Sequence, residues 1–255
     1  MMRWRGVLAA ALSLSVIACA TPQAPTPASP GTSQFVDVPG IGATRADVPR
    51  PSGPAPATCT PLAPGPADGQ TTVQRVAALR TLGFFTDRLD SDAAIAAAID
   101  DEATAEFGAA PRPTDPMTEL TTAAADDAHV WWRDLEADVD ESNKVYEGAV
   151  EEWAAISRGA FAPTAIEERW ASPTGPVTVA FTLNGTRHEL HPAYLEDWID
   201  PTILEPINAL IASSGRQFEA YRAFDQTLFV VALTTAEKRA LERERGWCFE
   251  WPSPG

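Results

Sequence analysis

Residues 20–70 set the limits of any folded domain in this chain of 255 residues. They consist mainly of Pro, Ala, Gly, Ser and Thr, as in TPQAPTPASPG and PRPSGPAPATCTPLAPGPADG. Such a composition buries too little apolar surface to offset chain entropy, and its prolines favour extended backbone. We therefore expect a disordered tether, which at about 3.1 Å per residue reaches on the order of 100 Å.

The segment before this tether has the pattern of an export signal. Arg3 and Arg5 form a short positive region, and an apolar run follows at residues 6–18. That run is shorter than the about 20 residues that a membrane-spanning helix needs. It ends on VIAC rather than on a small-residue A-x-A cleavage site, so Cys19 is the residue to explain.

The sequence VIAC, which ends at Cys19, resembles the lipobox of bacterial lipoproteins. In that family the cysteine thiol is joined to diacylglycerol, the chain is cut just before the cysteine, and the new amino group can receive a further acyl chain such as palmitate. The resemblance covers residues 1–20. It implies a signal peptide at 1–18 and a membrane anchor through the lipid on Cys19. An ordinary signal peptide with a chance cysteine is the alternative.

The same resemblance implies a location. Two or three acyl chains hold a protein stably on a membrane, whereas a single chain holds it only marginally. Ala20, rather than an acidic residue, follows the cysteine, and in lipoproteins this implies delivery to the outer membrane, facing the periplasm, where the cell has one. We therefore expect a lipid-anchored protein of the bacterial cell envelope.

Charge argues against one class of partner and favours another. The chain has 35 acidic and 19 basic residues, a formal net charge of −16, and loss of residues 1–18 removes two arginines and no acid. Nucleic-acid binding needs clustered Lys and Arg, so we expect no nucleic-acid partner. An acidic surface suits a cationic protein partner. A role of the charge in solubility alone is the alternative.

Two cysteines remain beside the one in the lipobox, and an even pair in an exported protein indicates a disulfide. Cys59 lies in the tether and Cys248 near the C-terminus. A bridge between them would close a very long loop, worth about 4–5 kcal/mol in the chain-entropy model. We expect this bridge, because exposed free thiols are a liability outside the cytoplasm. Two isolated thiols are the alternative.

Residues 71–255 are predicted to form a single α+β domain with a helical part at 71–160. Apolar residues at helical spacing predict a helix from 71 to about 82 and a second one from Ser91, which together would form an N-terminal helical hairpin. A long helix is expected over 142–158, with Asp140 or Ser142 at its start.

The part at 175–250 is predicted to be a ββαββα unit with a mainly antiparallel sheet. Asn184-Gly185 separates two strand-like runs, and both residues tolerate the positive φ of a two-residue hairpin turn. A helix through INALIASS and two further strands, RQFEAYRAF and TLFVVAL, follow. Thr234 and Glu237 form a capping box that starts the last helix. Strands and helices without regular βαβ units indicate the α+β class.

Sequence motifs that would indicate a catalytic, phosphate-binding or metal-binding site are weak throughout the chain. His188 and His191 lie three apart at a strand, where side chains alternate, so they would not share a metal. The acidic run around Asp138 departs from a calcium-binding loop, because Glu141 replaces its turn glycine, and an acidic helix start is the better interpretation. There is no GxSxG or glycine-rich phosphate loop. We therefore assign no catalytic residue, no metal site and no cofactor.

The tryptophans offer the remaining candidates for binding. Trp131 and Trp132 are adjacent, and in an extended segment both cannot enter one core, so we expect one of them to be exposed and to contact a partner. Core packing is the alternative for both.

The pattern LNG…DWID…INALI…F…FVVALT…ERGW, from Leu183 to Trp247, resembles uncharacterised bacterial proteins and implies a shared fold without a function. Together these features lead us to expect an envelope protein with a non-enzymatic domain that binds another protein, in its sharpest form an immunity-type inhibitor of a periplasmic toxin. An envelope hydrolase or a glycan-binding protein that uses surface carboxylates and tryptophans is the alternative.

Overall fold

The structure is a computed structural model that describes residues 67–114, 116–224 and 226–250. Helices and strands alternate irregularly along these residues, and all strand pairs are antiparallel, so the chain has an α+β fold. The predicted signal peptide, Cys19 and Cys59 lie outside the described residues, as does the tether up to residue 66. Among the described residues, no helix has the length and apolar character needed to span a membrane.

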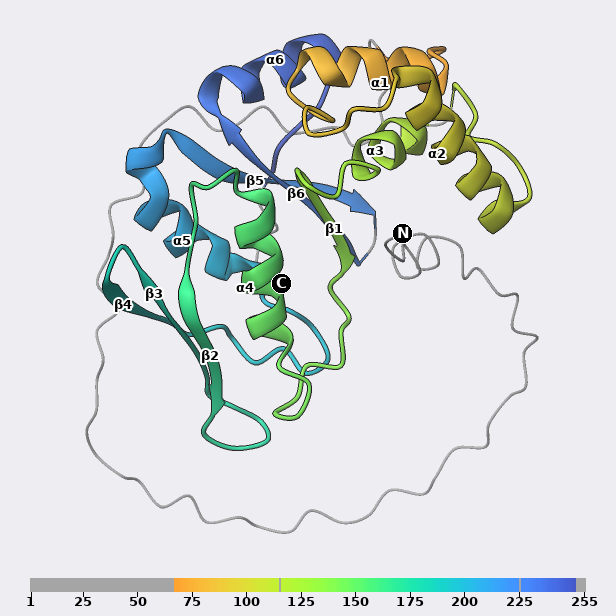
Figure 1. Ribbon diagram of the computed structural model, residues 1–255. Coiled ribbons are helices and arrows are strands. Elements are labelled where there is room, and N and C mark those ends of the chain that lie inside the picture. Colours follow the sequence, from red (N-terminus) through yellow and green to blue (C-terminus); the bar gives the residue numbers. More distant parts are fainter. Residues whose placement is uncertain (1–66, 115, 225, 251–255) are drawn as a thin grey trace, which may run out of the picture. The chain divides into compact units, whose positions relative to one another are not determined.

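A central sheet with the strand order β1-β6-β5 organises the fold (Figure 1). Strand β1 is Val130–Asp134, β5 is Arg216–Phe224 and β6 is Thr227–Thr234. The middle strand, β6, is buried along nearly its whole length, and its side chains enter two different cores in alternation. The sheet is therefore covered on both faces, which requires the near-continuous apolar sequence TLFVVAL.

Four helices cover the first face of this sheet: α1 (Thr72–Thr81), α2 (Asp92–Phe107), α3 (Pro116–Ala124) and α6 (Thr235–Arg245). Helix α1 begins at a capping box of Thr71 and Gln74. The predicted capping box of Thr234 and Glu237 is confirmed at the start of α6.

Two helices and a second sheet cover the other face (Figure 1). The helices are α4 (Val145–Ile156) and α5 (Leu204–Ile211), and the sheet has the order β2-β3-β4. Strand β2 is Thr164–Trp170, β3 is Val177–Leu183 and β4 is Thr186–Leu190. The predicted turn at Asn184-Gly185 is confirmed, with φ values of 51° and 79°.

The expected antiparallel pairing is confirmed, but the strands divide between two sheets instead of forming one. The hairpin β3–β4 pairs with β2, whereas β5 and β6 pair with β1, which precedes α4 in sequence. Helix α4 also starts later than expected, at Val145 rather than near Ser142. In α5, Pro206 lies in the first turn, where its missing N–H costs no intrahelical hydrogen bond.

Candidate functional site

The predicted contact residues, Trp131 and Trp132, are both buried, with exposures of 2% and 3%. They point to opposite faces of β1, and each face of the sheet has a core of its own. Trp131 packs edge-on against Trp153, and Trp132 packs against Phe229. The expectation that one of the two is exposed for a partner is therefore wrong, because it assumed a sheet with one free face.

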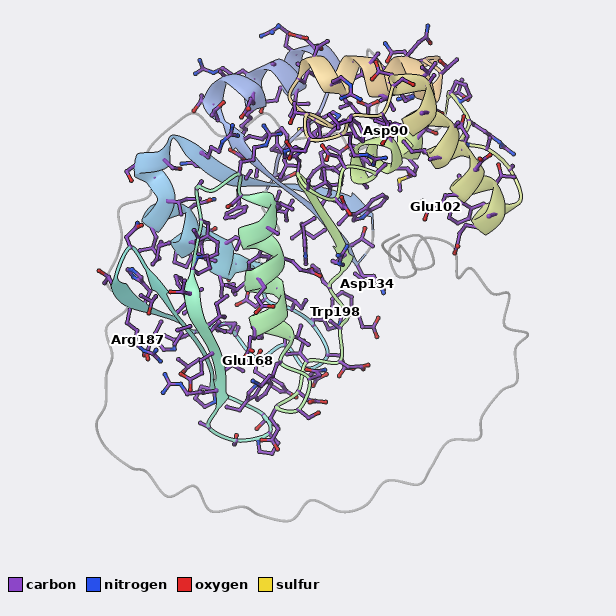
Figure 2. All side chains as sticks on the ribbon, viewed as in Figure 1. Asp90, Glu102, Asp134, Glu168, Arg187 and Trp198 are labelled. Atoms are coloured by element: carbon purple, nitrogen blue, oxygen red, sulfur yellow. The ribbon has the colours of Figure 1, made fainter. Side chains whose placement is uncertain are left out.

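Exposed aromatic side chains occur instead in the segment that joins β4 to α5. Tyr194, Leu195 and Trp198 are 36%, 45% and 37% exposed, and every residue from 193 to 198 is exposed. Figure 2 shows Trp198 below Asp134, the last residue of β1. Large apolar side chains exposed together are typical of interaction surfaces.

A second segment, residues 134–144, holds this one in place through backbone hydrogen bonds. The Ala137 amide donates to the Asp197 carbonyl at 2.7 Å, and the Ile199 amide donates to the Leu135 carbonyl at 2.8 Å. Trp198 lies opposite Glu136 as in a short antiparallel pair. The backbone that carries Trp198 is therefore fixed on both sides of the ring.

Asp200 fixes the end of the exposed segment. Its buried carboxylate accepts hydrogen bonds from the Ala193 amide at 2.8 Å and from the Thr202 amide at 3.0 Å. The Asp200 amide in turn donates to the Tyr146 hydroxyl at 3.0 Å. Burial raises the pKa of Tyr146 well above its ordinary value, so this phenol stays protonated. Residues 193–200 are thus tied to helix α4.

Tyr194 extends the aromatic contact to the second sheet. Its ring packs edge-on against Trp170 at the end of β2, with centroids 5.8 Å apart. The Trp170 indole N–H donates to Glu168 at 2.7 Å. The other oxygen of Glu168 accepts the amides of Tyr146 and Glu147 at 2.9 and 3.0 Å, so it caps the N-terminus of α4. Sequence reasoning missed this cap, because it comes from a different strand.

Exposed carboxylates lie in the same two segments as the exposed aromatic residues. The neighbouring exposed acids lie in the two paired segments, and the one lysine in these segments, Lys144, forms an ion pair with Glu147 at 3.0 Å. We call this area the Trp198 surface, and it consists of Tyr194, Leu195, Trp198, Glu136, Asp138, Glu196 and Asp197. Its combination of aromatic rings and negative charge suits a cationic partner.

The contacts of Asp140 show what the acidic run around Asp138, which was compared with a calcium-binding loop, does in the fold. Asp140 Oδ1 accepts hydrogen bonds from the Ser142 hydroxyl and amide at 2.6 Å and from the Asn143 amide at 3.2 Å. These bonds, first among them the one from the Ser142 hydroxyl, lower the pKa of Asp140. The carboxylate therefore stabilises the local turn. Across the described residues, no three His, Cys, Asp or Glu side chains are grouped as metal ligands.

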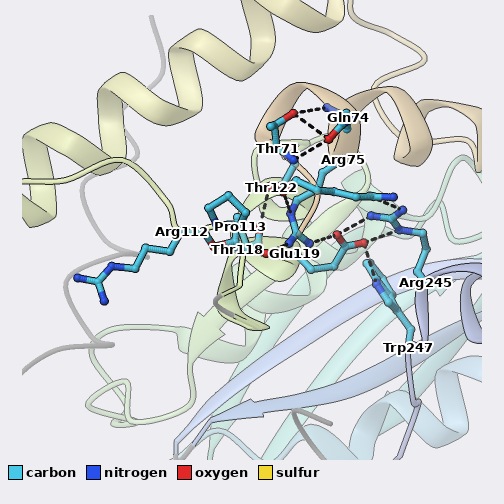
Figure 3. Close-up of polar contacts among 11 residues, drawn as sticks. Thr71, Gln74, Arg75, Arg112, Pro113, Thr118, Glu119, Thr122, Arg245 and Trp247 are labelled. Carbon is cyan, nitrogen blue, oxygen red and sulfur yellow. Dashed lines mark hydrogen bonds and ion pairs between the residues drawn. The ribbon is translucent and has the colours of Figure 1, made fainter. Parts of the chain in front are cut away.

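The remaining polar clusters join elements of the fold. Glu119 lies between two buried arginines, Arg75 and Arg245, with the Trp247 indole beside it (Figure 3). His129 pairs with Asp126 at 2.7 Å. His188, on β4, packs near Phe181 of β3, while His191 is exposed beyond the end of β4.

The C-terminal cysteine lies beside the core between the central sheet and helices α1, α2, α3 and α6. Cys248 is disulfide-bonded, and its neighbours Trp247 and Phe249 are buried. The pairing with Cys59 stays a prediction, because Cys59 lies outside the described residues.

The chain matches no family model, and searches against curated proteins and solved structures found no significant match. The Trp198 surface is therefore interpreted from its geometry and charge. Its signal in the sequence was the position of Trp198 among acids in the irregular stretch AYLEDWID, between Pro192 and Pro201.

Proposed function

We propose that this protein is a lipid-anchored protein of the bacterial cell envelope whose α+β domain binds another protein through the Trp198 surface. One observation carries the binding proposal: aromatic side chains are held exposed on a fixed backbone and are bordered by carboxylates. Exposed Trp and Tyr are the residues that most often dominate the energy of protein interfaces. A fixed backbone lowers the entropy lost on binding.

The charge of the surface supports a cationic partner. Lys or Arg side chains of the partner would contact the Trp198 ring and the carboxylates around it. Such a pair associates rapidly at low salt, because long-range attraction guides the encounter. An immunity-type inhibitor that neutralises a basic toxin in the periplasm is the sharpest form of this proposal.

The N-terminal part of the chain provides the anchor in this proposal. The lipid on Cys19 holds the chain at the membrane, and the proline-rich tether lets the domain reach partners on the order of 100 Å away.

A photo-crosslinking experiment tests the binding site. A photoreactive phenylalanine analogue replaces Trp198 in the full-length chain, in cells that make the anchored protein. The matched control carries the same analogue in place of Arg187, which is exposed on β4 in the second sheet (Figure 2). The proposal predicts one discrete protein adduct at position 198 and none at 187. Equal labelling at the two positions, or no adduct at 198, would contradict it.

A glycan-binding function is the second candidate. An exposed tryptophan beside carboxylates also suits a sugar ring, whose C–H groups stack on the indole and whose hydroxyl groups bind the acids. Binding of purified peptidoglycan fragments by the wild-type chain, abolished in Trp198→Ala, would favour this candidate over a protein partner.

A further inference from the structure

A short loop between α1 and α2, away from the Trp198 surface, presents one apolar side chain completely to solvent. Leu89 has a relative exposure of 102%, the highest among the large apolar residues that the structure describes. We call residues 86–90 the Leu89 loop, and all five are exposed. Figure 2 shows Asp90 of this loop beside α1 and α2, and Trp198 at a different part of the domain.

The guanidinium group of Arg80, from α1, holds the backbone on both sides of Leu89. Its Nη1 lies 3.2 Å from the Arg88 carbonyl oxygen, and its Nη2 lies 3.0 Å from the Asp90 carbonyl oxygen. An ion pair between Arg80 Nε and Asp92 at 2.7 Å orients the group. Arg80 thus binds the carbonyl oxygens of the residues before and after Leu89, but it does not bind the carbonyl oxygen of Leu89 itself.

Further contacts fix the start of the loop. The Phe85 carbonyl accepts hydrogen bonds from Arg80 Nη1 at 2.6 Å and from the Arg88 amide at 3.1 Å. The Phe85 amide donates to the buried Asp126 carboxylate at 2.6 Å. Within the loop, Arg88 forms an ion pair with Asp90 at 3.1 Å. The charged side chains beside Leu89 are therefore engaged within the domain, while Leu89 projects alone.

We propose that the Leu89 loop is an inhibitory loop for a serine protease, in which Leu89 enters an apolar specificity pocket. A pocket of this kind takes one large apolar side chain from an exposed backbone, as in chymotrypsin. The Leu89 carbonyl, which Arg80 does not bind, would then lie in the oxyanion hole of the protease. A loop held by its scaffold before binding loses little entropy, and this is the property that makes protease inhibitors bind tightly.

The position of Arg80 also explains how such a loop would resist cleavage. When the protease serine oxygen attacks the Leu89 carbonyl carbon, the Leu89–Asp90 amide bond breaks, an ester forms and the Asp90 nitrogen leaves with a proton as an amine. Arg80 still binds the Arg88 and Asp90 carbonyls, so the amine stays next to the ester. Its attack on the ester reforms the amide and returns the proton and the free serine, because held reactants combine at high effective concentration.

This inference is independent of the proposed function, since it uses other residues and another kind of partner. Its test measures inhibition of chymotrypsin and of trypsin by the purified full-length chain. Trypsin is the matched probe, because its specificity pocket carries a carboxylate and takes Lys or Arg instead of an apolar residue. We expect inhibition of chymotrypsin at an inhibition constant below about 1 µM, with the Leu89–Asp90 bond intact, and no inhibition of trypsin.

Two variants and one control sharpen the test. Leu89→Lys changes only a fully exposed side chain, and we expect inhibition to move from chymotrypsin to trypsin. Arg80→Ala, with its fold verified by circular dichroism, should raise the inhibition constant at least about tenfold and allow cleavage after Leu89. Trp198→Ala should inhibit like the wild type. Full chymotrypsin activity in excess wild-type chain, or a Leu89→Lys chain that leaves trypsin active, would overturn the proposal.

Discussion

Arg245 forms a two-point ion pair with Glu119: its Nε and Nη2 each lie 2.7 Å from one of the two carboxylate oxygens (Figure 3). Both side chains are buried, with exposures of 4% and 9%. Arg75 Nη1 approaches the same carboxylate, also at 2.7 Å. A single acid on α3 therefore connects the first helix of the domain to the last.

Replacing Glu119 by Gln is expected to lower the free energy of unfolding by about 3–5 kcal/mol, because it leaves two buried guanidinium groups without their counter-charge. Urea unfolding of the full-length chain measures this change. The matched control is Glu167→Gln, which breaks an exposed ion pair with Arg187 at 3.0 Å. The control should lose less than about 1 kcal/mol, so equal losses in the two variants would argue against the role of Glu119.

The stability of the protein should depend on pH through Glu219. Burial raises the pKa of this carboxyl above its ordinary value of 4.5, although the Lys238 ammonium, 2.8 Å away, opposes the shift. A raised pKa in the folded state stabilises the fold at low pH, and this contribution is lost as the pH rises through the folded-state pKa. As the pH falls from 7 to about 4.5, the free energy of unfolding of the wild type should therefore rise relative to that of Glu219→Gln. Urea unfolding at both pH values measures this, and a difference that is constant or falls would show that the shift is absent.

The tryptophans should differ in their access to solvent. Fluorescence quenching by acrylamide, which is neutral and is not repelled by carboxylates, should decrease when Trp198 is replaced by Phe, because this ring is exposed. The same replacement at Trp131 or Trp132, which are buried, should leave the quenched fraction unchanged. Strong quenching that disappears in Trp132→Phe would restore the expectation from the sequence.

Replacing Cys19 by Ser tests the proposed anchor. The thiol is the acceptor for the lipid, so the variant should leave the membrane fraction, as followed by fractionation and immunoblotting. A matched replacement, Ser15→Ala within the apolar run, should stay membrane-bound. Retention of the Cys19→Ser chain in the membrane would show that the lipobox interpretation is wrong.

Local features of this fold could be predicted from the sequence, because the residues that determine them are close together. The Asn184-Gly185 turn and the capping box of Thr234 and Glu237 each depend on at most four consecutive residues. The burial of both Trp131 and Trp132 depends on β6, whose residues Val230 and Phe229 pair with them from about 100 positions later. No local pattern encodes that pairing.

The same reasoning applies to the binding surface. The sequence shows a tryptophan among acids at Trp198, but its exposure depends on the pairing with residues 135–137, which lie about 60 positions earlier in the chain. The cap of α4 is a similar case. Asp140 and Ser142 lie a few residues before the helix and are the caps that the sequence predicts, whereas Glu168 binds the first amides of the helix from strand β2. Contacts between distant segments thus decide which aromatic residues and which carboxylates are free.

The affinity for the cross-linked partner tests the central claim most directly. Once the protein captured at position 198 is identified, calorimetry measures its dissociation constant with the full-length wild type, with Trp198→Ala and with the control Arg187→Ala. The proposed site predicts a loss of at least about 2 kcal/mol for Trp198→Ala, which is roughly a thirtyfold weaker complex, and little change for Arg187→Ala. Affinity for the wild type should also fall as salt rises. Equal affinity of the three chains would contradict the assignment of the Trp198 surface as the binding site.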